Sequence, residues 1–247
     1  MTGSTFVIVG ATGGIGSEVC RKLAAAGANL CLAARTPEPL AALATELMAA
    51  YPASTFATRT VDATRSADVE GLFQEAGTVA GAANLVGSIL LKPAHLTTDE
   101  EFDTTVSLNL STAFAVTRAA ARAMTPTGGS LVLMSSVAAA IGLTNHEAIA
   151  AAKAGVEGLV RSAAATYAPR GIRVNAVAPG LVRTPLSSRI TGNEASLKAS
   201  VAMHPLGRVG EPADVAAAVC WLLDPKTTWV TGQVVGVDGG LGRVRAR

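Results

Sequence analysis

The sequence predicts an α/β fold, a Rossmann-type doubly wound parallel sheet of about seven strands with helices on both faces. Three observations lead to this prediction. Short β-rich runs alternate with longer helical patterns, which is typical of parallel strands joined by crossover helices. The strand candidates are continuous apolar runs, as expected where both faces of a sheet are covered. A glycine-rich turn follows the first run and opens the first helical pattern.

The individual elements are expected in alternation along the chain. Strands are expected over the β-rich runs Phe6–Val9, Asn29–Ala33, Thr55–Thr60, Ala83–Val86, Ser130–Met134, Arg173–Val177 and Gln233–Val237. Helices are expected over the periodic, Ala-rich runs between them, Ile15–Ala26, Pro39–Ala50, Ala67–Thr78, Asp103–Met124, Glu147–Ala168 and Pro212–Leu223. No linker, composition shift or repeat divides the 247 residues, so we expect a single domain over residues 1–247.

The least regular part of the sequence is Thr184–Gly210, which contains Pro185, Pro205 and several Gly and Ser residues. In an open α/β sheet, ligands bind beyond the carboxyl ends of the strands. A long segment after the sixth predicted strand would lie over that crevice, so we interpret Thr184–Gly210 as a mobile lid over the substrate. A plain surface connection is the alternative. The apolar residues of the segment suggest a substrate with an apolar component: Leu186, Ile190, Leu197, Met203 and Leu206.

Composition limits the classes of function. A formal net charge of +2 gives no reason to expect nucleic acid as the main partner, and the basic end, Arg243–Arg247, is interpreted as a solvated tail. Cys20, Cys31 and Cys220 lie in apolar segments without a CxxC pair, which favours reduced core thiols over a metal or disulfide role. The chain start lacks signal-peptide features, and no apolar run approaches the roughly 20 residues that span a bilayer. We expect a soluble cytoplasmic protein that acts on a small molecule, with no nucleic-acid, membrane or metal partner.

The turn after the first predicted strand reads GATGGIG over residues 10–16. Residues without Cβ allow backbone amides to approach a pyrophosphate, and the helix that follows offers its positive N-terminal end. Because the turn lies between the first strand and the first helix, it predicts a dinucleotide site. The residues expected to contact the cofactor there are Gly10, Thr12, Gly14, Ile15 and Gly16.

The end of the second predicted strand bears on the choice of cofactor. An acidic residue there would bind the adenosine ribose hydroxyls and repel a 2′-phosphate, but Ala34 occupies the position and Arg35 follows. An Arg can pair with the phosphate through a charge-assisted fork, so NADP(H) is predicted over NAD(H). A solvated Arg at a helix start is the alternative.

Further motifs follow in an order that resembles the short-chain dehydrogenase/reductase family. The spacing of Gly10, Gly14 and Gly16 is similar to its G-x-x-x-G-x-G pattern. Other matching segments are Asp62 in VDAT, Asn84-Leu85-Val86-Gly87, Asn109 in SLNLSTAF, Ala178-Pro179-Gly180 with Thr184, His204-Pro205-Leu206-Gly207-Arg208 and Val237-Asp238-Gly239-Gly240. The resemblance covers nearly the whole chain and implies further cofactor contacts from Asp62, Ala63, Asn84, Lys153, Pro179, Gly180 and Thr184. It also implies a homo-oligomer, a tetramer or a dimer, with contacts through Asp103–Met124, Glu147–Ala168 and the C-terminal strand.

The resemblance also defines an unusual catalytic end. In the family a Ser holds the substrate carbonyl, a Tyr exchanges its proton, a Lys binds the nicotinamide ribose and lowers the Tyr pKa, and an Asn holds a water. Asn109, Ser136 and Lys153 fall in the matching positions, but Ile149 occupies the position of the Tyr. Neighbouring Ser135 is expected to be structural.

An isoleucine cannot exchange a proton, and removing a general acid or base costs about 10²–10⁴ in rate. His146 is the nearest titratable alternative, one helical turn before Ile149 and two before Lys153. A capping or surface role for His146 is the competing interpretation. Glu147 is interpreted as a first-turn helix charge. Lys153 is a further candidate, directly or through water, although binding the cofactor ribose is its favoured task.

Three functions remain open from the sequence. The first is an NADP(H)-dependent oxidoreductase acting on a carbonyl, an alcohol or a conjugated double bond, with an atypical proton donor or none. The second is a non-redox isomerase or lyase that uses Ser136 and Lys153 in new roles. The third is a catalytically silent subunit that keeps its NADP site.

Overall fold

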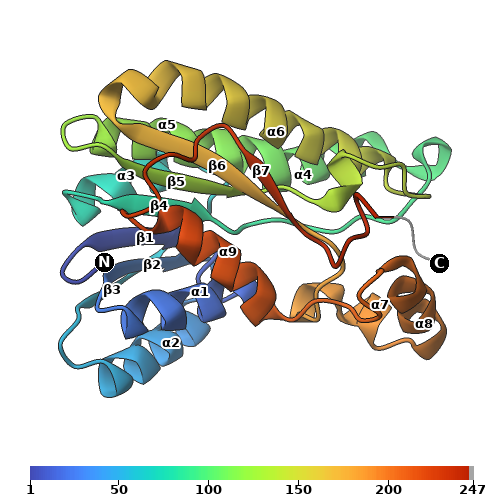
Figure 1. Ribbon diagram of the computed structural model, residues 1–247, viewed down its shortest axis with the longest axis horizontal. Helices are drawn as coiled ribbons and strands as arrows, with labels where there is room; N and C mark the ends of the chain where they lie inside the picture. Colours follow the sequence, from blue (N-terminus) through green and yellow to red (C-terminus); the bar gives the residue numbers. More distant parts are fainter. Residues whose placement is uncertain (245–247) are drawn as a thin grey trace.

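The computed structural model describes residues 1–244, and its centre is one parallel sheet of seven strands in the order β3-β2-β1-β4-β5-β6-β7 (Figure 1). The strands are β1 Thr5–Val9, β2 Asn29–Ala34, β3 Phe56–Thr60, β4 Gly81–Asn84, β5 Gly129–Met134, β6 Ile172–Pro179 and β7 Val234–Val237. After β3 the chain crosses back over β1 to add β4 on the other side. This reversal is the doubly wound arrangement, so the predicted fold class is confirmed.

Helices cover both faces of the sheet (Figure 1). They are α1 Gly14–Ala25, α2 Pro37–Ala50, α3 Ser66–Ala76, α4 Asp99–Val106, α5 Thr112–Met124, α6 Glu147–Tyr167, α7 Ser188–Thr191, α8 Glu194–Met203 and α9 Pro212–Leu223. Val7 and Val9 of β1 pack with α3, α5 and α6, whereas Phe6 and Ile8 pack with α1, α2 and α9. Successive side chains of a strand point to opposite faces, so the apolar runs of the central strands supply two cores at once.

The helix predicted over Asp103–Met124 is present, but it begins earlier and is interrupted by a π turn. The structure has α4, then a π-helical turn over Ser107–Ser111, then α5. Helix α4 begins earlier than predicted because Thr98 and Glu101 form a capping box. The Glu101 amide donates to Thr98 Oγ1 at 3.2 Å, and the Thr98 amide donates to the Glu101 carboxylate at 2.9 Å. The other predicted helices and strands are present, with ends that differ by a few residues.

The segment 184–210 is more regular than the sequence predicts. It contains a 3₁₀ turn over Pro185–Ser187, followed by α7 and α8. Side-chain caps start two of these elements: the Ser187 amide donates to Thr184 Oγ1 at 3.3 Å, and the Ser196 amide donates to Asn193 Oδ1 at 2.9 Å. Helices α7 and α8 lie beyond the carboxyl end of the sheet, apart from the two helical layers (Figure 1).

Two further predictions concern the cysteines and the basic C-terminal tail. The three cysteines have free thiols, and Cys20 and Cys31 are buried while Cys220 is half-buried. The predicted solvated tail, Arg243–Arg247, lies partly outside the described residues. Within residues 1–244, no helix combines the length and the apolar character needed to cross a membrane.

Candidate active site

The carboxyl edge of the sheet carries most of the residues predicted for the site. In the order of the strands that they end or follow, they are Gly10 (β1), Arg35 (β2), Asp62 and Ala63 (β3), Asn84 (β4), Ser136 (β5), and Pro179, Gly180 and Thr184 (β6). Asn109 and Lys153 come from the π turn and from α6. The fold thus brings residues that are far apart in the sequence to the edge where open α/β sheets bind ligands.

The glycine-rich turn has the form of a phosphate cradle. Gly10 has φ of +86°, a conformation that favours glycine, and its amide donates to the carbonyl of Ala33 at 2.9 Å. A Cβ on Gly16 would overlap the carbonyl oxygen of Gly10, so α1 can start this close to the turn only with glycine. The N-cap, Gly13, offers no side-chain cap, and the first amides of a helix, Gly14–Gly16, have no partner within it. These amides are available to an anion.

The start of the segment 184–210 lies against this turn. A Cβ on Gly14 would be 3.0 Å from Cγ2 of Thr184. Thr12, in the same turn, is half-buried, and Ile15 is half-buried at the start of α1. Thr184 is therefore close to the proposed phosphate cradle although the two are far apart in the sequence.

Arg35 borders a hollow of about 410 Å³ between the ends of β2 and β3 and helix α4. Asp62, Asp103 and Thr64 also line it. The pKa of Asp62 is lowered, chiefly by hydrogen bonds from the hydroxyl and amide of Thr64, with smaller contributions from the charges of Arg35 and Arg65. Arg35 is the cation of this hollow, and it lies where the sequence predicts a 2′-phosphate.

Asn84 fixes the end of β4. Its side-chain amide donates to Thr112 Oγ1 at 3.3 Å, and its Oδ1 accepts the Val86 amide at 3.3 Å. The side chain is buried, and it joins the loop after β4 to the first turn of α5. Its predicted contact with the cofactor stays a prediction.

Asn109 occupies the middle of the π turn and is buried. Its Nδ2 donates to the carbonyl of Thr105 and to Ser88 Oγ, both at 2.9 Å, and its Oδ1 accepts the Ser88 amide at 3.2 Å. Ser88 is a site residue that the sequence analysis missed, because the matched motif ends at Gly87. The serine directly after that motif was the signal in the sequence that could have identified it.

Lys153 is a buried cation at the same edge. Its side chain is 5% exposed, and its Nζ donates to the carbonyl of Met134 at the end of β5 at 2.8 Å. A Cβ on Gly87 would be 3.5 Å from Lys153 Nζ and 2.9 Å from Asn109 Oδ1, so Lys153 and Asn109 border one small space. Burial lowers the pKa of Lys153 to about 8. The ammonium can therefore release its proton near neutral pH.

Ile149 lies on α6 one helical turn before Lys153, and it is 5% exposed. Ser136 follows β5 with extended backbone, and its Oγ accepts the amide of Ala138 at 3.2 Å. The Ser136 hydroxyl hydrogen remains available to a substrate oxygen. Ser135, expected to be structural, is buried and donates to the carboxylate of Glu157 at 2.9 Å.

His146 is the N-cap residue of α6. Its Nδ1 lies 2.7 Å from the carbonyl oxygen of Thr144, and a carbonyl can only accept, so Nδ1 carries the hydrogen. The ring is half-buried. This contact fixes the loop before α6, and Glu147 follows as an exposed first-turn charge.

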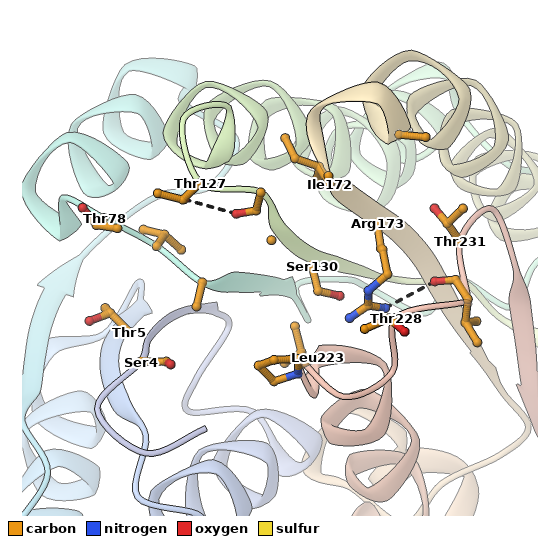
Figure 2. Close-up of a pocket in the computed structure, with 18 of the residues that line it drawn as sticks. Ser4, Thr5, Thr78, Thr127, Ser130, Ile172, Arg173, Leu223, Thr228 and Thr231 are labelled. Atoms are coloured by element: carbon orange, nitrogen blue, oxygen red, sulfur yellow. Dashed lines mark hydrogen bonds between the residues drawn. The ribbon is translucent and has the colours of Figure 1, made fainter.

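A hollow of about 930 Å³ lies at the opposite edge of the sheet (Figure 2). Arg173 reaches into it from β6, and its guanidinium donates to the carbonyls of Leu222, Asp224 and Val230 at 2.9, 3.2 and 3.3 Å. Two of these carbonyls belong to the C-terminal end of α9, so Arg173 serves as a cap for that helix. None of the predicted site residues lines this hollow, and the carboxyl edge remains the candidate site.

Comparisons with known proteins concern nearly the full chain. Residues 10–242 match the family described as enoyl-(acyl carrier protein) reductase. Over 248 residues the chain is 36% identical to galactitol 2-dehydrogenase (L-tagatose-forming) of Cereibacter sphaeroides, with 97% of this chain and 95% of that protein covered.

Solved structures are also similar to this chain over nearly its full length. The fold is similar to that of a short-chain type dehydrogenase/reductase from Mycobacterium ulcerans, with a TM-score of 0.93, 32% identity, and 100% of this chain and 93% of that one covered. It is also similar to a variant of actinorhodin polyketide ketoreductase with NADPH, with a TM-score of 0.90, 28% identity, and 99% and 100% of the two chains covered.

Proposed function

This chain belongs to the short-chain dehydrogenase/reductase family, and from that premise we propose that it is an NADP(H)-dependent oxidoreductase whose proton donor is not a tyrosine. As a family member it is an NAD(P)-dependent oxidoreductase of alcohols or carbonyl compounds. One observation carries the finer proposal: an aliphatic side chain, Ile149, is buried one helical turn before the buried Lys153.

Arg35 supports the preference for NADP(H). No carboxylate ends β2, and Arg35 faces the hollow where a 2′-phosphate would form a charge-assisted pair. The residues present fit the dinucleotide, because the first amides of α1 have no partner within the helix and Gly13 and Gly14 carry no Cβ that would fill the space beside them. When bound, NADP(H) supplies or accepts the hydride. The chain's own residues bind it through that turn, Arg35, Thr184 and Lys153.

Lys153 is the proposed source of the proton. An acid is most effective when its pKa lies near the working pH, and burial brings the pKa of Lys153 to about 8. Nζ has three hydrogens and gives one to the Met134 carbonyl, so two remain for a substrate oxygen or an intervening water. Ser136 is proposed to hold the same oxygen. His146 is the second candidate donor, with its Nδ1–H already given to Thr144.

The substrate is proposed to be a carbonyl compound, an alcohol or a conjugated double bond with an apolar body. Leu186, Met203 and Leu206 of the segment 184–210 are large apolar side chains that are 56%, 44% and 73% exposed, and so they are accessible to an apolar substrate. We therefore propose that 184–210 is a substrate-covering lid. A homo-oligomer is proposed as well, and the exposed Phe102 and Phe114 on α4 and α5 support contacts through these helices.

Transfer of deuterium tests the proposal. The protein is incubated with NADPH deuterated at the transferable position and a panel of apolar ketones and enones, and the products are examined by mass spectrometry. Deuterium in a product, with NADPH preferred over NADH, supports the proposal. Product formation without cofactor turnover indicates a non-redox isomerase or lyase. Tight NADPH binding without any turnover indicates a silent subunit, and either result refutes the proposed function.

A further inference from the structure

We propose that His204 is a positioning residue that ties the lid helix α8 to the end of β6, and that it does so only while its imidazole is neutral. The inference rests on the proposed function, because the segment that His204 holds directly follows Pro179 and Gly180, which are predicted to contact the cofactor.

His204 follows α8 and is 3% exposed. Its Nδ1 lies 2.6 Å from the carbonyl oxygen of Ser200, and since a carbonyl can only accept, Nδ1 carries a hydrogen. Its Nε2 lies 3.2 Å from the amide nitrogen of Leu181, and since an amide N–H can only donate, Nε2 is a bare acceptor. Both nitrogens are used, and this pair of contacts fits only the neutral ring.

The ring is tightly enclosed by backbone. A Cβ on Gly180 would be 2.6 Å from His204 Nε2, and one on Gly239 would be 3.5 Å from His204 Cδ2. A backbone hydrogen bond connects the same two segments further along the chain: the Gly210 amide donates to the carbonyl of Leu181 at 2.8 Å. The imidazole therefore lies at the point where the lid segment meets the strand ends β6 and β7.

Charged groups near the ring already have partners. Asp238, after β7, accepts the amides of Gly240 and Gly242 at 2.9 and 2.8 Å. Arg208 and Asp214, which border the same hollow as His204, form an ion pair at 2.6 Å. Helix α8 contributes the carbonyl of Ser200. A proton added to the ring would thus lie in a buried position among groups that already have hydrogen-bond partners.

Protonation would put a hydrogen on Nε2 directly against the amide hydrogen of Leu181. Two donors cannot bond to each other, so the contact is lost and the end of α8 separates from β6. The geometry therefore predicts that the lid is held while the ring is neutral and is released when the ring takes up a proton.

The test compares His204→Gln and His204→Leu with the wild-type protein, with His95→Gln as the control at an exposed site. Glutamine offers a donor and an acceptor but does not titrate, and leucine offers neither. Two readouts are followed from pH 8 to 5.5: the Kd for NADPH, and the trypsin cleavage rate at Arg189 and Lys198 of α7 and α8. Each cleavage rate is divided by the rate on a free peptide at the same pH.

For the wild type and His95→Gln, cleavage in the lid and the Kd for NADPH are expected to rise about tenfold as the pH falls, the scale of one lost hydrogen bond. His204→Gln should show neither rise, and His204→Leu should show fast cleavage at every pH. Equal pH dependence in the wild type and His204→Gln overturns the inference. Absence of NADPH binding at pH 8 refutes the proposed function instead, while the cleavage readout still decides the role of His204.

Discussion

Replacing Ile149 by tyrosine is expected to create an efficient ketone reductase. The new phenol would lie one helical turn before Lys153, whose buried positive charge would lower the phenol pKa from about 10. A positioned general acid contributes about 10²–10⁴ in rate. We therefore expect kcat/KM for a reducible ketone to rise by that factor, which corresponds to about 2.7 to 5.5 kcal/mol of activation free energy.

The structure also sets the stability cost of this variant. Ile149 is 5% exposed, so the larger ring must displace its neighbours, and overpacking of this kind costs about 1–3 kcal/mol. A domain of this size is expected to tolerate that loss, with a Tm lower by a few degrees. Circular dichroism at the assay temperature confirms that the variant is folded before its activity is measured.

Ile149→Phe is the matched control, because it adds the same ring without the hydroxyl. NADPH oxidation is followed by absorbance with the same ketone panel for the wild type and both variants. Only Ile149→Tyr is expected to gain activity. If the Tyr and Phe variants are folded, bind NADPH and reduce ketones equally, then position 149 is not beside the reacting carbonyl and the proposed geometry is refuted.

The remaining predictions concern three side chains of the same edge. Arg35→Asp is expected to weaken NADPH binding about 10- to 100-fold and to improve NADH binding, since a charge-assisted pair is lost; titration with both cofactors checks this. Lys153→Met is expected to stabilise the cofactor-free protein at pH 7 by up to roughly 3 kcal/mol, because burial lowers the pKa of Lys153 from 10.5 to about 8. The wild type should become more stable as the pH rises from 8 to 10.5, because over this range the unfolded chain binds more protons than the folded chain. Urea unfolding at pH 7 and pH 10 measures this gain, which should be absent in Lys153→Met. His146→Ala is expected to leave the pH–rate profile unchanged, because Nδ1 of His146 is engaged with Thr144. If one of the two sides of the profile disappears in this variant, His146 is the proton donor.

The fold was predictable because its signals are local and repeated. Most strands are apolar runs and the long helices are periodic, so errors in single boundaries leave the order of elements intact; the edge strand β3, FATRT, is the least apolar. The π turn at Ser107–Ser111 was not predictable, because its residues continue the helical pattern on both sides and the extra residue appears only in the backbone hydrogen bonds. The helices α7 and α8 were missed because Pro, Gly and Ser favour loops, although Thr184 and Asn193 are also good caps.

The candidate site was predictable where one residue type satisfies one physical need. Gly10 needs a positive φ, and Gly16 needs the absence of a Cβ, so their pattern can be read directly. Contacts that use backbone atoms leave no such trace. The acceptor of Lys153 is the carbonyl of Met134, and the partners of His204 are a carbonyl and an amide, so almost any residue type except proline at the amide could occupy those partner positions.

The energetics of Lys153 argue for an active site over a silent one. Burying an ammonium beside a single carbonyl lowers its pKa and destabilises the folded chain by roughly 3 kcal/mol at neutral pH. Packing does not require that cost, because a methionine would fill similar space without a charge. A site without a nucleotide would gain from that exchange, whereas a site that binds one would lose the contact between Lys153 and the cofactor. A catalytic site requires an amine with a shifted pKa and with hydrogens free for a ribose or a substrate. Lys153, beside Asn109, has both properties.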